Sequence, residues 1–530
     1  MSDARNPTAD GEADDLSGRS RMAWNVMASW LGHSVFVVAG FFLPRIIDRH
    51  LGQTGLGIWD FGWSLVSYLG IAQVGVGSSV NRFVAKRRAE RDTEGLNRTV
   101  SSVMFLQGLI ALAVIVLTVG GTWMVPTLLS AQLGGFVSEA RMVVFLLGLG
   151  VTAQMALNPY VGVITGCHRW DLHNAISGSM YGVTAIGMAA TVMLGGGLPA
   201  LAAVNFAGTL LSEIIRAVAA HRVCPELRIR WSSVSFGEAR TLLSFGGKTV
   251  VGVLSGLLLY QTNALQIVGH LGAASLALYS RPMSLVRHVR TFANKFAMVL
   301  TPTASSLHAA GRTDELRALL EQSCRASASL GLPPILALAI MGDPILRLWM
   351  GAHYAAGTLV AVLALGHLGD IAKQPVWNIL VGTNMHGRAA GLSLVSSTIA
   401  VAMCAMALGP LHGGLAAAAL ALTVPMTIVE SFGTTFYACR RLGISFGPFL
   451  LHVWRRPLLA VLPFAACLVA SRLALPNDPL LSLAAGLLVG GLLLAGTYWK
   501  WVIPASLKTR GLDAARGALS KMRRRLAWAG

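Results

Sequence analysis

The sequence predicts an all-α polytopic membrane protein of about 14 transmembrane helices, built as two parallel six-helix repeats followed by a C-terminal helical hairpin. Three observations lead to this prediction. Hydrophobic residues make up 54% of the 530 residues and charged residues only 12%, which is more apolar surface than one soluble core can bury. Apolar runs of about 20 residues, the length that crosses the hydrocarbon core, recur along the chain. Basic residues gather between alternate runs, as expected for loops on the cytoplasmic side.

The fourteen apolar runs define the expected domains. We place them at 22–47, 54–81, 98–124, 141–166, 172–194, 198–220, 242–268, 272–303, 326–346, 356–382, 389–409, 413–438, 457–472 and 479–503. The predicted domains are a disordered cytoplasmic tail (1–21), two six-helix bundles (22–221 and 242–440) joined by a cytoplasmic linker (222–241), an additional helix pair (441–503) and a basic amphipathic cytoplasmic tail (504–530).

The orientation follows from the distribution of lysine and arginine. With the N-terminus inside, the cytoplasmic segments hold 32 of the 42 basic residues and the opposite side holds five. This asymmetry predicts a bacterial cytoplasmic (inner) membrane protein with both termini cytoplasmic. The outer connections are short, so they leave no external domain for catalysis, and we do not expect an enzyme.

The chain repeats itself at a period that fits six helices. The residues His50, Leu51 and Gly52 recur as His270, Leu271 and Gly272, and 159–166 matches 375–382. An even number of spans returns the chain to the same side, so the repeats are parallel and a transport site is expected between them.

Three stretches carry a family resemblance, at 50–85, 166–172 and 344–355. They resemble the oligosaccharide flippases of the multidrug/oligosaccharidyl-lipid/polysaccharide exporter superfamily, over roughly 22–440. The resemblance implies a MATE-like fold. It also implies a transporter that moves a polyprenyl-pyrophosphate-linked oligosaccharide to the outer leaflet by alternating access, for polysaccharide biosynthesis. Asn263 stands where many relatives carry Asp, so a charged ion-coupling side chain is not expected there.

Other functions stay open at this point. A peptidoglycan lipid-precursor flippase differs in substrate rather than in chemistry. A multidrug or toxic-compound extruder would share the fold, but we expect twelve spans and an acidic cavity for that class. A membrane polysaccharide polymerase or ligase would need a larger outer loop than this chain contains.

The run at 272–303 carries the candidate substrate site. Its polar face holds Arg281, Arg287, His288, Arg290 and Lys295. A charged residue near the bilayer centre costs about 2.5–3.5 kcal/mol, so this face is expected to line an aqueous cavity that binds a pyrophosphate group. The competing interpretation is that the end residues reach the membrane interfaces while the middle residues bond to other helices.

Four further ionisable residues inside spans are candidates for gating or ion coupling. Asp370 and Lys373 stand three residues apart and can meet on one helix face, either as a locking ion pair or as a proton relay. Asp60 and Glu430 are lone acids in their spans and candidate partners for the basic face, with structural charge balance as the alternative.

The expected partners are a polyprenyl-pyrophosphate glycolipid, anionic lipids of the inner leaflet and other polysaccharide-assembly proteins. The lipid expectation rests on the tail at 504–530, where an apolar face lies between basic residues. The +19 net charge is explained by topology, so no nucleic acid is expected. The sequence indicates no metal site, cofactor or disulfide framework.

Overall fold

The computed structural model describes residues 22–73, 76–235, 237, 251–503 and 508–509. The predicted tail at 1–21 and nearly all of the predicted amphipathic tail at 504–530 lie outside these ranges. Within them every regular element is helical. The chain forms two compact units, which are considered one at a time: unit 1 is residues up to Leu278 with 408–412, and unit 2 is the rest.

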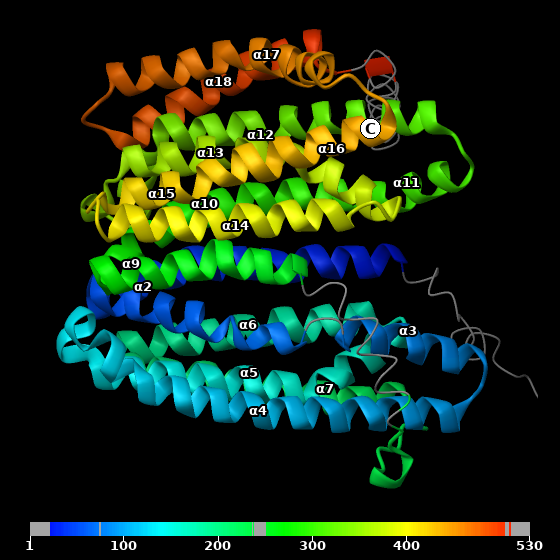
Figure 1. Ribbon diagram of the computed structural model, residues 1–530. Helices are drawn as coiled ribbons and strands as arrows, with labels where there is room; N and C mark the ends of the chain where they lie inside the picture. Colours follow the sequence, from blue (N-terminus) through cyan, green and yellow to red (C-terminus); the bar gives the residue numbers. More distant parts are fainter. Residues whose placement is uncertain (1–21, 74–75, 236, 238–250, 504–507, 510–530) are drawn as a thin grey trace, which may run out of the picture. The chain divides into compact units, whose positions relative to one another are not determined.

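Unit 1 is a bundle of long helices with short connecting turns (Figure 1). Its helices are α2 (Met22–Val66), α3 (Val76–Ala89), α4 (Thr93–Leu133), α5 (Val137–Gly166), α6 (Trp170–Met193), α7 (Leu198–Val223) and α9 (Asn263–Leu271). Short 3₁₀ segments lie at Leu69–Gln73, Gly134–Phe136 and Trp231–Ser233, and a π-helical segment, Leu258–Thr262, leads directly into α9. α5 packs against both α4 and α7, and α2 packs along α6. A buried apolar cluster that includes Val84, Val100, Ile164 and Ala220 joins α3, α4, α5 and α7 at one end.

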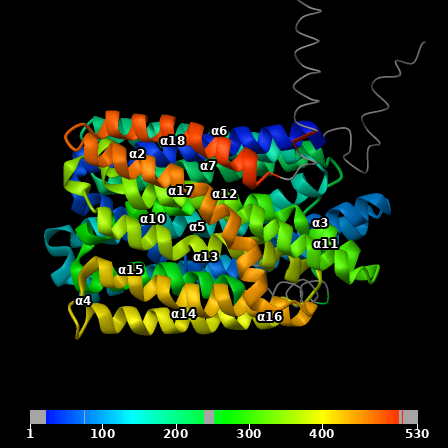
Figure 2. The same cartoon turned by 90° about the horizontal axis from the view of Figure 1, so that it is seen from above.

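Unit 2 begins within α10 (Ala273–Met298). It continues with α11 (Leu300–Ala309), α12 (Thr313–Trp349), α13 (Gly357–Gly382), α14 (Gly387–Leu408), α15 (Gly414–Pro425), the π-helical segment η7 (Met426–Phe432), α16 (Gly433–Leu442), α17 (Phe446–Ala474) and α18 (Pro479–Trp501). α12 packs along α13 and against α17, and α17 and α18 form an antiparallel pair (Figures 1 and 2). A buried apolar cluster of this unit includes Leu320, Val376, Ala438 and Val453.

Ten helices among the described residues are long and apolar enough to cross a membrane. They are Thr93–Thr127, Leu129–Gly166, Trp170–Met193, Leu198–Val223, Val251–Leu271, Thr313–Trp349, Gly387–Leu408, Gly414–Leu442, Phe446–Ala474 and Pro479–Trp501, and each overlaps one of the predicted spans. Their outward side chains are apolar: Leu488 and Leu492 of α18, for example, are 71% and 76% exposed. Because water would not stabilise such surfaces, the protein is a membrane protein. The count of fourteen spans stays a prediction.

The second predicted span, 54–81, is wrong as one continuous helix. α2 consists of two helical stretches separated by a non-helical residue, Gly52; the second stretch ends at Val66, and α3 starts at Val76. The Ser67 hydroxyl donates to the Trp63 carbonyl at 2.6 Å, and the amides of Tyr68 and Gly70 bond three residues back instead of four. After Val66 the backbone therefore changes from α-helical to 3₁₀ hydrogen bonding, over Leu69–Gln73.

Residues with positive φ angles recur along the chain at a nearly constant spacing. Positions 52, 91, 134, 168 and 195 are followed 216 to 220 residues later by positions 272, 311, 351, 384 and 412. The first pair is the closest match: Gly52 has φ 72° and ψ 172°, and Gly272 has φ 83° and ψ 170°. Only glycine adopts this conformation readily, so the recurring His-Leu-Gly sequence corresponds to a recurring bend of the backbone.

Each of three proline residues in unit 2 leaves one backbone carbonyl without its helical hydrogen-bond donor. In each case a side chain from a neighbouring helix donates a hydrogen bond to that carbonyl instead. Proline lacks the amide that would bond to the carbonyl four residues earlier. The carbonyls concerned are those of Ile371 (freed by Pro375), Ser329 (Pro333) and Ile340 (Pro344), and they accept hydrogen bonds from Ser327, Tyr498 and Arg472 respectively. Since water is absent from the bilayer core, such bonds make the prolines tolerable, and they tie α17 and α18 to α12.

Candidate functional site

The centre of the candidate site is a buried carboxylate in unit 2. Asp370, in the middle of α13, is 1% exposed. Its Oδ2 atom accepts a hydrogen bond from Nε of Arg290 on α10 at 2.5 Å, and its Oδ1 atom lies 3.1 Å from Nζ of Lys373. The i, i+3 pairing predicted for Asp370 and Lys373 is present. Two cations thus hold one carboxylate where an uncompensated charge would be very costly.

A second acid completes the network. Nζ of Lys373 donates to Oε1 of Glu430 at 2.6 Å, and the two side chains are 4% and 14% exposed. Glu430 lies in the π-helical segment η7, which directly follows Pro425. Wider π winding shifts the direction of side chains relative to an α-helix and often marks a functional site. We call Arg290, Asp370, Lys373 and Glu430 the charge network, which is neutral overall.

Glycines bring the helices of the network close together. A Cβ atom at Gly366 of α13 would overlap Thr423, and one at Gly369 would lie 3.2 Å from Cβ of Ser431. The Thr427 hydroxyl also donates to the Gly366 carbonyl at 2.9 Å. These small residues let α15 and η7 approach α13, and that close approach puts Glu430 within reach of Lys373.

A ladder of buried polar residues continues along the same face of α13. Nε2 of Gln374 lies 3.4 Å from Oδ2 of Asp370, and the Thr301 hydroxyl lies 3.2 Å from Oδ1 of Asn378. His367 is one turn before Asp370 and is 1% exposed. None of these was predicted as a site residue, although their spacing of three, four and four residues was a readable signal of one polar helix face.

A sequence profile for the family described as "Polysaccharide biosynthesis protein" matches residues 69–357, which is more than half of the chain. The chain belongs to this family. A Shigella flexneri protein named as an O-antigen transporter is 23% identical over 355 residues, covering 64% of this chain and 81% of the relative.

The fold of this polysaccharide biosynthesis protein is that of known transporters. The Lipid II flippase MurJ, in an inward closed conformation, is similar with a TM-score of 0.69 at 12% identity, over 93% of this chain and 100% of the flippase. An inward-facing multidrug transporter of the MATE family in the MOP superfamily gives 0.66 at 14% identity, over 76% of this chain and 93% of that one. The protein therefore has a MATE-like fold, as its resemblance implied.

The residues of the predicted basic face of α10 differ in their exposure to solvent. Arg287 and His288 are exposed, Lys295 is half-buried and the Arg290 side chain is 38% exposed. Arg281 differs from the expectation of an exposed residue, because it is only 6% exposed and lies on a stretch where Tyr279 and Met283 are also buried. α10 therefore offers its accessible positive charge toward its C-terminal half.

The two predicted repeats each contain a buried acid at corresponding positions, but the acids have different partners. Glu213 of α7 precedes Glu430 by 217 residues, within the spacing of the recurring bends, and is 2% exposed. It pairs with Arg216 of its own helix, whereas Glu430 pairs with Lys373 of another. The buried pair in α7 was not predicted, although both residues lie inside the predicted span 198–220. Asp60 belongs to unit 1, on α2, and is half-buried.

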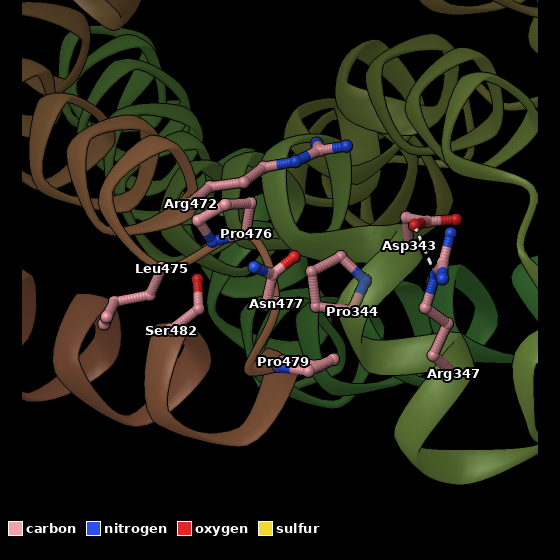
Figure 3. Close-up of a pocket in the computed structure, with 9 residues that line it drawn as sticks. All are labelled: Asp343, Pro344, Arg347, Arg472, Leu475, Pro476, Asn477, Pro479 and Ser482. Atoms are coloured by element: carbon pink, nitrogen blue, oxygen red, sulfur yellow. Dashed lines mark hydrogen bonds and ion pairs between the residues drawn. The ribbon is translucent and has the colours of Figure 1, made fainter.

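A separate polar pocket of about 390 Å³ lies where the α17–α18 turn meets the end of α12 (Figure 3). Arg347 is turned toward Asp343, with its Nε atom 2.8 Å from Oδ2, and Arg472 extends from α17 toward α12, where it bonds to the Ile340 carbonyl. Both arginines thus have structural partners, so we assign this pocket to anchoring of the C-terminal helix pair rather than to transport.

Proposed function

We propose that this protein is a flippase that moves a polyprenyl-pyrophosphate-linked oligosaccharide from the inner to the outer leaflet of a bacterial cytoplasmic membrane by alternating access. Membership of the polysaccharide biosynthesis family and the O-antigen transporter relative support the substrate class. The fold shared with a Lipid II flippase supports a lipid-linked substrate.

The observation that carries the proposal is the excess of positive charge around the network. Two predicted spans, 272–303 and 356–382, contain a single acid, Asp370, beside five basic residues, namely Arg281, Arg287, Arg290, Lys295 and Lys373. This excess of positive charge in the two spans suits the phosphates of a pyrophosphate group. It does not suit the cationic compounds that a multidrug extruder would carry.

Arg290 is the residue through which substrate would act on the network. Its side chain is 38% exposed while its partner Asp370 is 1% exposed, so a phosphate can reach the guanidinium from the accessible side. A phosphate that binds Arg290 competes with Asp370 and weakens the link between α10 and α13. Substrate binding thereby favours one conformation over another, which is the requirement for coupled transport.

The proposed architecture is fourteen spans in two parallel six-helix repeats plus the α17–α18 hairpin, with both termini cytoplasmic. The recurring backbone bends and the recurring acids Glu213 and Glu430 support the two repeats. In the first repeat, Gln154 and Leu157 stand 216 residues before Asp370 and Lys373, so the charge network is expected in the second repeat only.

The test is a titration of purified protein with a polyprenyl-pyrophosphate oligosaccharide at two salt concentrations. Charge-assisted hydrogen bonds contribute about 1.5–3 kcal/mol, so Arg287→Gln, Arg290→Gln and Lys295→Gln should each weaken binding by roughly ten- to hundredfold. Arg312→Gln is the matched control, because Arg312 is an exposed turn residue paired with Glu315. It should bind like the unmodified protein.

Two outcomes would contradict the proposal in different ways. Unchanged affinity in all three α10 variants, combined with lower melting temperatures, would make the basic face structural. Tighter binding of the peptidoglycan precursor than of longer oligosaccharides would keep the flippase mechanism but change the substrate, in line with the likeness to the Lipid II flippase.

A further inference from the structure

A second basic site of unit 2 lies on α14 and α16 and shares no residue with the charge network. It is a pocket of about 580 Å³. Its lining residues are Arg388, Leu392, Gly433, Phe436, Tyr437, Arg440 and Arg441. Neither the transport proposal nor the family relationship assigns a role to it.

The polar side of this pocket carries uncompensated charge. The arginines Arg388, Arg440 and Arg441 are all exposed, and none of their side chains makes a hydrogen bond or ion pair with the described residues. No acidic residue lines the pocket, and Glu430, the only acid between 371 and 445, is bound to Lys373. Three guanidinium groups that converge without a partner favour an anion with several oxygen atoms, above all a phosphate.

The other side of the pocket is apolar and continues into a lipid-facing surface. Phe436 is 50% exposed and lies beside Leu392 in the lining. From Leu392, an exposed apolar stripe extends along α14 with a spacing of three or four residues, through Val395, Ile399, Met403 and Met406. Such spacing places the stripe on one face of α14, and the stripe runs along the helix away from the end that carries Arg388. The pocket therefore combines an anion site with a track for an acyl chain.

The pocket is also held in shape before any ligand binds. The Tyr437 hydroxyl donates to the Met385 carbonyl at 3.2 Å, which ties α16 to the turn that precedes α14. Gly433 lies beside Leu392 in the lining, where an added Cβ atom would already make van der Waals contact with Leu392 at 3.6 Å, so a larger side chain would occupy the pocket. A preformed site needs less ordering on binding than a flexible one.

We propose that this pocket binds the phosphate head group of an anionic phospholipid of the cytoplasmic leaflet. The arginines belong to the side of the membrane that holds most of the basic residues, and basic pockets between transmembrane helices on that side suit anionic head groups. The proposal depends on this orientation and not on the identity of the transported substrate. It gives the expected anionic-lipid partner a defined site, separate from the tail at 504–530.

Native mass spectrometry of the purified full-length protein tests the proposal, with phosphatidylglycerol, phosphatidylethanolamine, polyprenyl pyrophosphate and inorganic phosphate as separate probes. Phosphatidylglycerol should bind in preference to phosphatidylethanolamine. Each arginine near the membrane surface contributes about fivefold in affinity, so Arg388→Gln should weaken binding about fivefold and the Arg440→Gln, Arg441→Gln double variant about 25-fold.

A neighbouring arginine pair provides the matched control. Arg455 and Arg456 of α17 are exposed and do not line the pocket, so the Arg455→Gln, Arg456→Gln double variant loses the same charge elsewhere in unit 2. It should retain phosphatidylglycerol within twofold. Gly433→Leu should reduce binding at least tenfold without any change of charge, since the new side chain would occupy the pocket.

Three results would overturn the proposal. Equal losses in the two double variants would show general attraction to charge rather than a site. Full binding to Gly433→Leu would show that the pocket is not occupied. Polyprenyl pyrophosphate or inorganic phosphate binding in preference to phosphatidylglycerol, and lost with Arg440 and Arg441, would assign the arginines to substrate or to a free anion instead.

Discussion

The hydroxyl of Tyr498 donates a hydrogen bond to the backbone carbonyl of Ser329 at 2.8 Å, across the interface between α18 and α12. That carbonyl is available because Pro333, four residues later, has no amide to donate. The interaction therefore joins a helix of the C-terminal pair to a helix of the second predicted repeat at a point fixed by a proline.

Removal of the Tyr498 hydroxyl should destabilise the protein by about 0.6–1 kcal/mol, as measured by thermal unfolding of Tyr498→Phe in detergent. Pro333→Ala restores an amide that can donate to Ser329. In the Pro333→Ala background, Tyr498→Phe should reduce the stability of the protein clearly less, because the Ser329 carbonyl keeps a hydrogen-bond donor. An equal cost in both backgrounds would mean that the hydroxyl does not compensate for the proline.

The recurring bends depend on glycine. Gly52→Ala and Gly272→Ala should each destabilise unit 1 by about 1–3 kcal/mol, because an L side chain is strained at these positive φ angles. Gly269→Ala is the control: its added Cβ meets nothing within 4 Å and its backbone is helical, so it should be neutral or stabilising by up to about 1 kcal/mol. Comparable melting temperatures for all three variants would argue against the bend.

The charge network predicts non-additive mutations. Lys373→Met leaves Glu430 without its partner and should destabilise the protein by about 3–5 kcal/mol, whereas Lys373→Met combined with Glu430→Gln should cost much less. Lys86→Met, which removes an exposed pair with Glu90, should cost about 0–1 kcal/mol. Thermal unfolding of these variants and of the single Glu430→Gln variant checks this, and additive losses at the two positions would show that the two residues act separately.

The orientation can be checked with single cysteines in a background without the six native ones. Cysteines at Ala352 and Asn477, both exposed turn residues, should react with a membrane-impermeant reagent added outside the cell. Cysteines at Arg228 and Arg312, equally exposed, should react only after the membrane is opened. Reaction of the Arg228 position from outside would reverse the assigned sides of the membrane.

Local pairings could be predicted from sequence, and pairings between distant segments could not. Asp370 and Lys373 share a helix face, so their spacing was sufficient. Arg290 lies 80 residues from its partner Asp370, and Glu430 lies 57 residues from its partner Lys373. These two contacts depend on the glycines of α13 and on the π winding of η7, and neither feature has a periodic signal in the sequence. The predicted span 54–81 failed for a similar reason, since apolar content does not distinguish a continuous α-helix from one that changes to 3₁₀ hydrogen bonding at Leu69–Gln73.

The bonds from Tyr498 and Arg472 to α12 have a practical consequence for following transport. Because two side chains fasten α17 and α18 to carbonyls eleven residues apart on one helix, the hairpin is expected to travel with α12 as a single body during alternating access. A spin label at the exposed Asn477 would then report displacement of α12 from a position remote from the charge network. A label on the hairpin would therefore record the movement of α12 without a change to any residue of the charge network.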